Sequence, residues 1–169
     1  MNSLSNSIDR ILRWLGHAAS YGILLMTLVT FLVVVLRYGF STGWIALQES
    51  VMYLHALVFM LGAAYTLRDD GHVRVDIFYR NFSATQQAWV NIIGTLLLLF
   101  PVCIFIFAMS WDYVVNSWQL MESSKEAGGL PLVFILKSLI PVFCLTLLLQ
   151  GCADVLRYLG VIKQAAGAH

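Results

Sequence analysis

The chain has 169 residues, of which 60% are hydrophobic and 11% are charged, and its formal net charge is +1. A soluble globular domain carries about 25% charged residues, so this composition excludes that class and predicts an integral membrane protein. We expect no nucleic-acid partner.

Residues 1–17 begin the chain with a helical pattern that separates apolar from charged positions. Such a segment is typical of an amphipathic interfacial helix, which lies along the membrane surface before the chain turns in. The apolar face consists of Leu4, Ile8, Ile11, Leu12 and Leu15. The charged face consists of Asp9, Arg10 and Arg13.

Four apolar runs follow, at about residues 18–38, 45–67, 88–110 and 130–153. Each is close to the ~20 residues that a membrane-crossing helix needs. The first run is too long for a cleaved signal, and no small-residue cleavage site follows it, so we expect it to remain in the mature protein. Pro101 and Pro141 each remove a backbone hydrogen bond and are predicted to bend their helices. The expected fold is therefore an all-α membrane protein with four transmembrane helices (18–157), an interfacial helix (1–17) and a tail (158–169).

The distribution of lysine and arginine between the connecting segments predicts the orientation, because positive charge is retained on the cytoplasmic side. One side of a four-span chain carries Arg10, Arg13, Arg68, Arg74, Arg80, Arg157 and Lys163. The other side carries Arg37 and Lys125. We therefore expect both termini, and the tail, in the cytoplasm.

Glu49 and Lys137 are ionisable residues inside predicted spans, where charge is costly and faces protein or a water-filled cavity. Glu49 is either a proton carrier or the structural counter-ion of Arg37 or Lys137. The two cations are predicted near the same membrane face as Glu49, and this favours the structural ion pair.

The stretch "RDDGHVRVD" (68–76) is the most polar part of the chain. Asp69, Asp70, His72 and Asp76 offer oxygen and nitrogen ligands for a divalent ion. However, the interleaved arginines would pair with these carboxylates, and the alternation of apolar and polar residues favours a loop that lies against a surface.

The remaining candidate residues favour structural roles. His17 and His55 are predicted at different depths, which disfavours a bis-histidine haem site. The cysteines, Cys103, Cys144 and Cys152, lack metal-binding or redox spacing and are interpreted as packing residues. We find no nucleophile with a base, no phosphate loop and no zinc spacing, so neither an enzyme nor a cofactor is expected.

Small residues lie along one side of the second span and would let another helix approach closely. They are Ala56, Gly62, Ala63 and Thr66. The segment between the third and fourth spans ends in a turn that contains Gly128, Gly129 and Pro131.

The order of these features resembles the small membrane subunit (DctQ-like) of tripartite ATP-independent periplasmic (TRAP) transporters. The resemblance rests on "VVVLRYGF", on "GWIALQESVMYLHALVFMLGAAYTLRDDGHVRVD" and on "GGLPLVFILKSLIP", and it extends from Arg13 to Arg157. The positions that match the family pattern are Arg37, Tyr38, Trp44, Glu49, Gly62, Ala63, Ala64, His72, Arg74 and Asp76. Lys137 departs from the commonest form of the family, which is uncharged there.

The resemblance implies a scaffold subunit in a bacterial inner membrane, in a sodium-coupled system for organic-acid uptake. A large membrane subunit would carry the substrate, a periplasmic binding protein would deliver it, and the small subunit would also contact membrane lipids. It further implies a cytoplasmic signature loop formed by Arg68, His72, Arg74 and Asp76. The implied periplasmic docking loops contain Trp44, Glu122, Lys125, Gly128, Gly129 and Pro131.

Two other classes of protein share some of these features. A small proton-coupled multidrug exporter also has four short spans and a membrane glutamate, but it needs that glutamate in the first span, which here has no charge between its ends. A haem or quinone anchor of a respiratory complex is disfavoured by the histidine depths.

Overall fold

The computed structural model describes residues 3–69, 71 and 79–166. Four stretches of helix in this described part are long and apolar enough to cross a membrane. They are Arg10–Gly39, Ile45–Arg68, Ala84–Gln119 and Val133–Ala166. This confirms the prediction of an all-α protein with four membrane-spanning helices.

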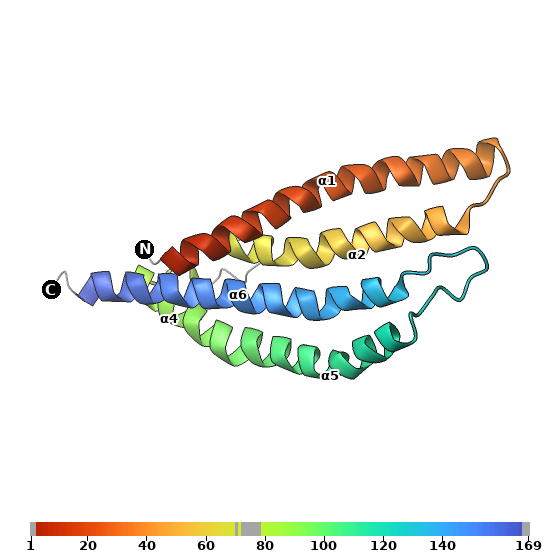
Figure 1. Ribbon diagram of the computed structural model, residues 1–169. Helices are drawn as coiled ribbons and strands as arrows, with labels where there is room; N and C mark the ends of the chain where they lie inside the picture. The colour runs from red at the N-terminus through yellow and green to blue at the C-terminus, as the bar shows by residue number, and fades with distance from the viewer. Residues whose placement is uncertain (1–2, 70, 72–78, 167–169) are drawn as a thin grey trace.

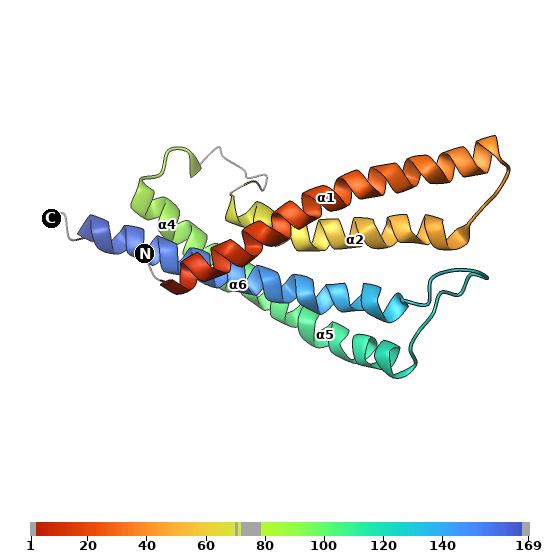
Figure 2. The ribbon, with the colours of Figure 1, turned by 45° about the horizontal axis from the view of Figure 1, so that its top comes forward.

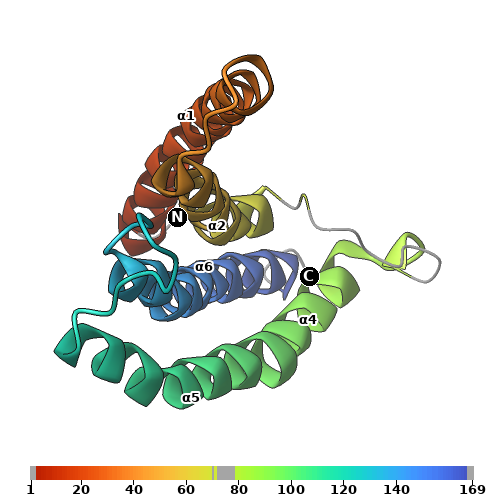
Figure 3. The same cartoon turned by 90° about the vertical axis from the view of Figure 1, so that its right-hand side faces the viewer.

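The elements, in chain order, are α1 (Ser3–Gly39), α2 (Ile45–Arg68), α4 (Ala84–Gly94), a π-helical turn η1 (Thr95–Leu99), α5 (Phe100–Gln119) and α6 (Val133–Ala166). Helix α6 lies at the centre: the α1–α2 hairpin packs on one side of it and the α4–η1–α5 segment curves around the other (Figure 3). Both ends of the chain lie at one end of the bundle, which we call the terminal end (Figure 1). The connections 40–44 and 120–132 lie at the opposite end, called the loop end here.

Helix α1 is continuous from Ser3 to Gly39, so the expected turn between a separate interfacial helix and the first span is wrong. Part of the apolar face of this segment packs on the protein itself, whereas Ile11 is 61% exposed. Leu12 is 2% exposed, and Ile8 and Leu15 pack against the same core cluster. Figure 2 shows these first turns of α1 crossing over α6. The packing of Leu12 and its neighbours against the core cluster, which includes Cys144 and Leu147 of α6, favours a helix that continues without a break.

The third span contains the bend predicted from Pro101, and the structure shows how the backbone makes it. The amide of Phe100 donates to the carbonyl of Thr95, five residues earlier, which is π-helical spacing. Because proline has no amide hydrogen and its ring crowds the carbonyl four residues earlier, a widened turn just before it is a common solution. By contrast, α6 continues through Pro141 and runs to Ala166, so most of the expected tail is helical.

The core is small, and it is built where helices approach closely. One cluster of buried residues within it consists of Leu12, Ala64, Cys103, Cys144 and Leu147. Within their most apolar stretches, 33% of α6 is buried, against 11% of α1, 6% of α2 and 11% of the third span. Helix α6 is therefore the packed centre, and the other three helices keep most of their apolar surface exposed.

Candidate functional sites at the two ends of the bundle

At the loop end, the carboxylate of Glu49 binds the connection between α5 and α6. Glu49 lies in the first turns of α2 and accepts hydrogen bonds from the Ser124 hydroxyl and from the Leu130 amide, the latter at 2.6 Å. The connection also bonds to itself, from the Ser124 amide to the Leu130 carbonyl at 3.1 Å. Hydrogen bonds to a carboxylate are stronger than those between neutral groups. Glu49 therefore fixes residues 124–130 to the start of α2.

A second carboxylate, that of Glu122, joins the same connection to α6. Lys137 donates to it at 2.5 Å and the Ser117 hydroxyl donates at 2.7 Å. The Lys137 ammonium also lies 3.8 Å from the centre of the Tyr113 ring, within the range of a cation–π contact. The hydrogen bonds from Lys137 and Ser117 hold the pKa of the Glu122 carboxyl below its usual value of 4.5. The Glu122 carboxylate therefore compensates the positive charge of Lys137 on α6.

These contacts correct the expected ion pair of Glu49 with Arg37 or Lys137. Among the described residues, Lys137 pairs with Glu122, and the partners of Glu49 are the neutral Ser124 and Leu130. Arg37 is exposed near the end of α1. A loop carboxylate reaches Lys137 because the chain reverses direction between Gln119 and Val133, which sequence spacing alone did not reveal.

The other expected loop residues have distinct environments. Gly129 packs closely, because a Cβ there would lie 2.5 Å from the Ser124 hydroxyl oxygen and 2.8 Å from a Glu49 oxygen. Gly128 has a φ of 82°, which favours glycine. Lys125 and Pro131 are exposed, and Trp44, the residue before α2, is 62% exposed.

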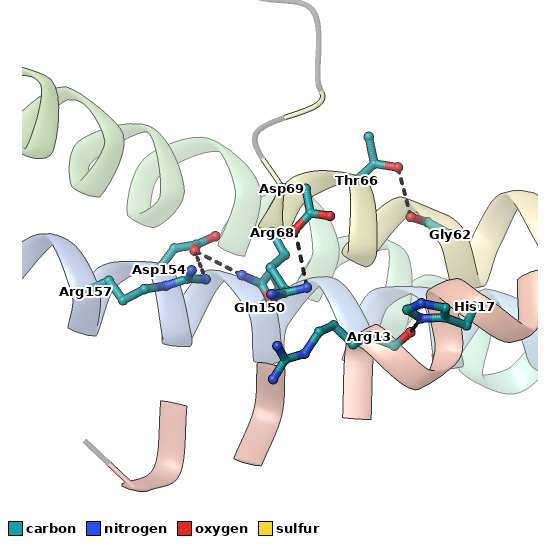
Figure 4. Close-up of polar contacts among 9 residues, drawn as sticks. All are labelled: Arg13, His17, Gly62, Thr66, Arg68, Asp69, Gln150, Asp154 and Arg157. Atoms are coloured by element: carbon teal, nitrogen blue, oxygen red, sulfur yellow. Dashed lines mark hydrogen bonds and ion pairs between the residues drawn. The ribbon is translucent and has the colours of Figure 1, made fainter. Parts of the chain in front are cut away.

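A polar cluster lies at the terminal end, where α2 and α6 meet (Figure 4). Gln150 of α6 is fully buried and donates to Asp154 at 2.9 Å, and Arg157 donates to the same carboxylate oxygen at 2.6 Å. Arg68 at the end of α2 pairs with Asp69 at 3.3 Å. Sequence reasoning missed Gln150, although a polar residue inside an apolar run is a signal that it faces protein.

Comparison with known proteins identifies the class of protein. Residues 26–160 match the family of tripartite ATP-independent periplasmic transporters, DctQ component. The chain belongs to this family. A TRAP transporter small permease protein of Haemophilus influenzae is 32% identical over 132 residues, which cover 78% of this chain and 77% of that protein. No solved structure matches significantly.

The DctQ match covers both sites, since the loop-end contacts and the Gln150–Asp154–Arg157 cluster lie within 26–160. The chain is thus a subunit of a TRAP transporter and a multi-pass membrane protein, and its family is a transporter component rather than an enzyme. Arg68 of the signature loop is described, whereas His72, Arg74 and Asp76 lie outside the described residues. Of the four candidate metal ligands in this stretch, the structure describes Asp69.

The small residues of α2 do not all have the same environment. Ala63 packs against the core, so it is not fully available to a partner. A Cβ at Gly62 would meet nothing within 4 Å, and the Thr66 hydroxyl bonds back to the Gly62 carbonyl at 3.0 Å. Ala56 is partly exposed. Gly62 is thus the position where another helix has most room to approach.

Proposed function

We propose that this DctQ component is a scaffold that carries no substrate itself. In this proposal it braces the large membrane subunit of a sodium-coupled TRAP transporter, and it helps to dock the periplasmic substrate-binding protein during organic-acid uptake. It would act in a bacterial inner membrane, in contact with lipids.

The observation that carries the proposal is the distribution of burial. Helix α6 is the packed centre, while α1, α2 and the third span expose large apolar side chains along their lengths, for example Phe31 at 67% and Phe105 at 65%. Membrane helices that pack tightly on only one side leave the other sides for lipid or for another subunit. A thin four-helix unit with such sides is suited to bracing a larger partner.

The loop end supports the docking role. Glu49 and Glu122 hold the connection 120–132 on α2 and α6, so the loop that carries Lys125 is held in place. Trp44, the residue before α2, is exposed at the same end. A surface that is held in place before binding loses less conformational entropy when a partner docks.

The distribution of cations supports an orientation with both termini in the cytoplasm. Arg10, Arg13, Arg68, Arg80, Arg157 and Lys163 belong to segments at the terminal end, and Arg37 and Lys125 to the loop end. With positive charge retained inside, the loop end faces the periplasm, where a binding protein would reach it.

Uptake measurements test the scaffold role. The large subunit is reconstituted into liposomes with or without this chain, and uptake of an organic acid is measured with the binding protein outside and an inward sodium gradient. We expect no uptake with this chain alone and uptake with both membrane subunits. Uptake by the isolated chain, or full activity of the large subunit without it, would contradict the proposal.

Thiol labelling in intact cells tests the orientation. In a Cys152→Ser background, cysteines introduced at Thr42 and Ser123 should react with a membrane-impermeant maleimide, whereas a cysteine at Asn81 should react only after the cells are opened. The opposite pattern would mean that the loop end faces the cytoplasm.

A further inference from the structure

The imidazole of His55 is exposed at the middle of a membrane-spanning helix. His55 is ten residues from Ile45 in a 24-residue helix, or about 15 Å from that end at the α-helical rise. Its side chain is exposed, and its ring stacks on Phe59 with a centroid distance of 6.3 Å and an interplanar angle of 14°. Among the described residues, neither ring nitrogen has a hydrogen-bond partner.

The two exposed threonines of the first span bond to their own backbone. The Thr27 hydroxyl donates to the Ile23 carbonyl at 2.9 Å, and the Thr30 hydroxyl donates to the Met26 carbonyl at 2.7 Å. His17 also bonds to the carbonyl four residues earlier, at 2.7 Å from Arg13. His55 makes no such bond among the described residues, and its ring stacks on Phe59, one turn later in the same helix.

An imidazole without a partner is unfavourable in hydrocarbon, and polar groups at this depth face protein or a water-filled cavity. The side of α2 that carries His55 is not covered by this chain. Val58 and Tyr65 face Gly22 and Gly16 of α1, and Ala64 lies in the core with α6. In Figure 3, α1 and α6 lie on two sides of α2.

The uncovered side has the shape of a helix-packing surface. We call it the His55 face, formed by Met52, His55, Phe59 and Gly62. Their spacing of three and four residues places them on one side of the helix. Met52 is 51% exposed and Phe59 is 67% exposed, and Gly62 has open space above it. A neighbouring helix could approach closely at Gly62 and contact the ring of Phe59.

We propose that a membrane-spanning helix of the large subunit packs on the His55 face and presents a hydrogen-bonding group to the His55 imidazole. This inference rests on the proposed function, which supplies that second membrane chain. A second copy of this chain fits less well. If two copies met side by side through this face, the polar group at that depth would be another imidazole, and one of the two rings would keep an unbonded N–H.

Purification of the complex tests the inference. The large subunit is co-expressed with tagged wild-type chain, His55→Leu, His55→Gln or Leu159→Ala, and the ratio of large to small subunit is measured after purification in mild detergent. Leu159 is the control, because it is an exposed apolar residue of α6 and belongs to none of the surfaces proposed to meet the large subunit. We expect His55→Leu to weaken association about tenfold, as for one interhelical hydrogen bond. We expect His55→Gln to retain most of the association and Leu159→Ala to match wild type.

The thermal stability of each isolated chain is measured in parallel. It should be the same for His55→Leu and wild type, because no bond within the chain is lost. A wild-type ratio in His55→Leu, an equal loss in His55→Gln, or a matching loss of stability in the isolated chain would overturn the inference alone. A photo-crosslinking residue at Phe59 should attach to the large subunit, and attachment to a second copy would also overturn it. Absence of the large subunit from the wild-type purification would overturn the proposed function as well.

Discussion

Replacing Gly16 by alanine should force α1 and α2 apart. Gly16 is buried against α2, and a Cβ there would lie 2.4 Å from Cδ2 and 2.5 Å from Cγ of Tyr65. Carbon atoms in good contact are about 3.5–4.0 Å apart, so a gap of about 1 Å must open. Because Cγ is held next to the backbone, rotation of the ring alone cannot remove this overlap.

The cost can be separated from the general effect of removing a glycine from a helix. Overpacking of this kind costs about 1–3 kcal/mol, whereas alanine gains about 1 kcal/mol over glycine in a helix interior. Gly160 lies within α6 with nothing within 4 Å of a Cβ, so Gly160→Ala should show the gain without the overlap. The unfolding free energies of the two variants should therefore differ by about 1–3 kcal/mol.

The assay is reversible unfolding of the purified chain in detergent micelles, followed by far-UV circular dichroism. Equal stabilisation by Gly16→Ala and Gly160→Ala would refute the close packing of α1 on α2. A double-mutant cycle adds a second check: in a Tyr65→Ala background, Gly16→Ala should lose its cost, because the atoms that it overlaps are gone.

Three further predictions concern other parts of the molecule. Glu49→Ala should accelerate hydrogen exchange of the Leu130 amide, measured by mass spectrometry, whereas Lys125→Ala should not, because Glu49 is the acceptor of that amide. The pKa of Glu122 is lowered from 4.5 in the folded chain, so its stabilising effect is complete above pH 4.5 and is lost as pH falls through the lowered value. The thermal stability of Glu122→Gln should therefore fall less at acid pH than that of wild type, and the same pH profile in both would contradict this. In micelles, a small maleimide should label Cys152 first, because Cys103 and Cys144 are buried; Cys152→Ser should remove this fast reaction, and its persistence would count against the burial of the other two.

The number of spans could be predicted from the sequence because membrane crossing depends on local hydropathy and length. The limits of the helices could not, because a helix can continue beyond the apolar run. Helix α6 extends to Ala166 although its apolar run ends near Ala153. The bend near Pro101 was predictable from the chemistry of proline, but the π-helical turn at Thr95–Leu99 also depends on packing. A Cβ at Gly151 of α6 would lie 2.7 Å from Phe100 and 2.9 Å from Leu99.

The candidate sites were predictable as residues but not as pairs. Glu49 and Lys137 stood out because charge inside a span needs compensation. Their partners come from the connection 120–132, and its path over the ends of α2 and α6 is a tertiary property. Glu122 was expected in a docking loop, and its ion pair with Lys137 was not predicted. Spacing along a helix identifies residues on one face, but it does not identify which loop folds back onto that face.

Among the described residues, several charged groups near the two ends of the bundle have partners within the chain, whereas the His55 imidazole at mid-span has none. At the loop end, both oxygens of Glu49 have donors and Glu122 neutralises Lys137. At the terminal end, Asp154 binds both Gln150 and Arg157. His55 differs, because it is exposed at mid-span, where water cannot replace a missing partner. A chain that exposes an imidazole at the centre of a membrane-spanning helix is suited to a partner in the membrane. Association through the side of α2, rather than through the loops alone, follows from that difference.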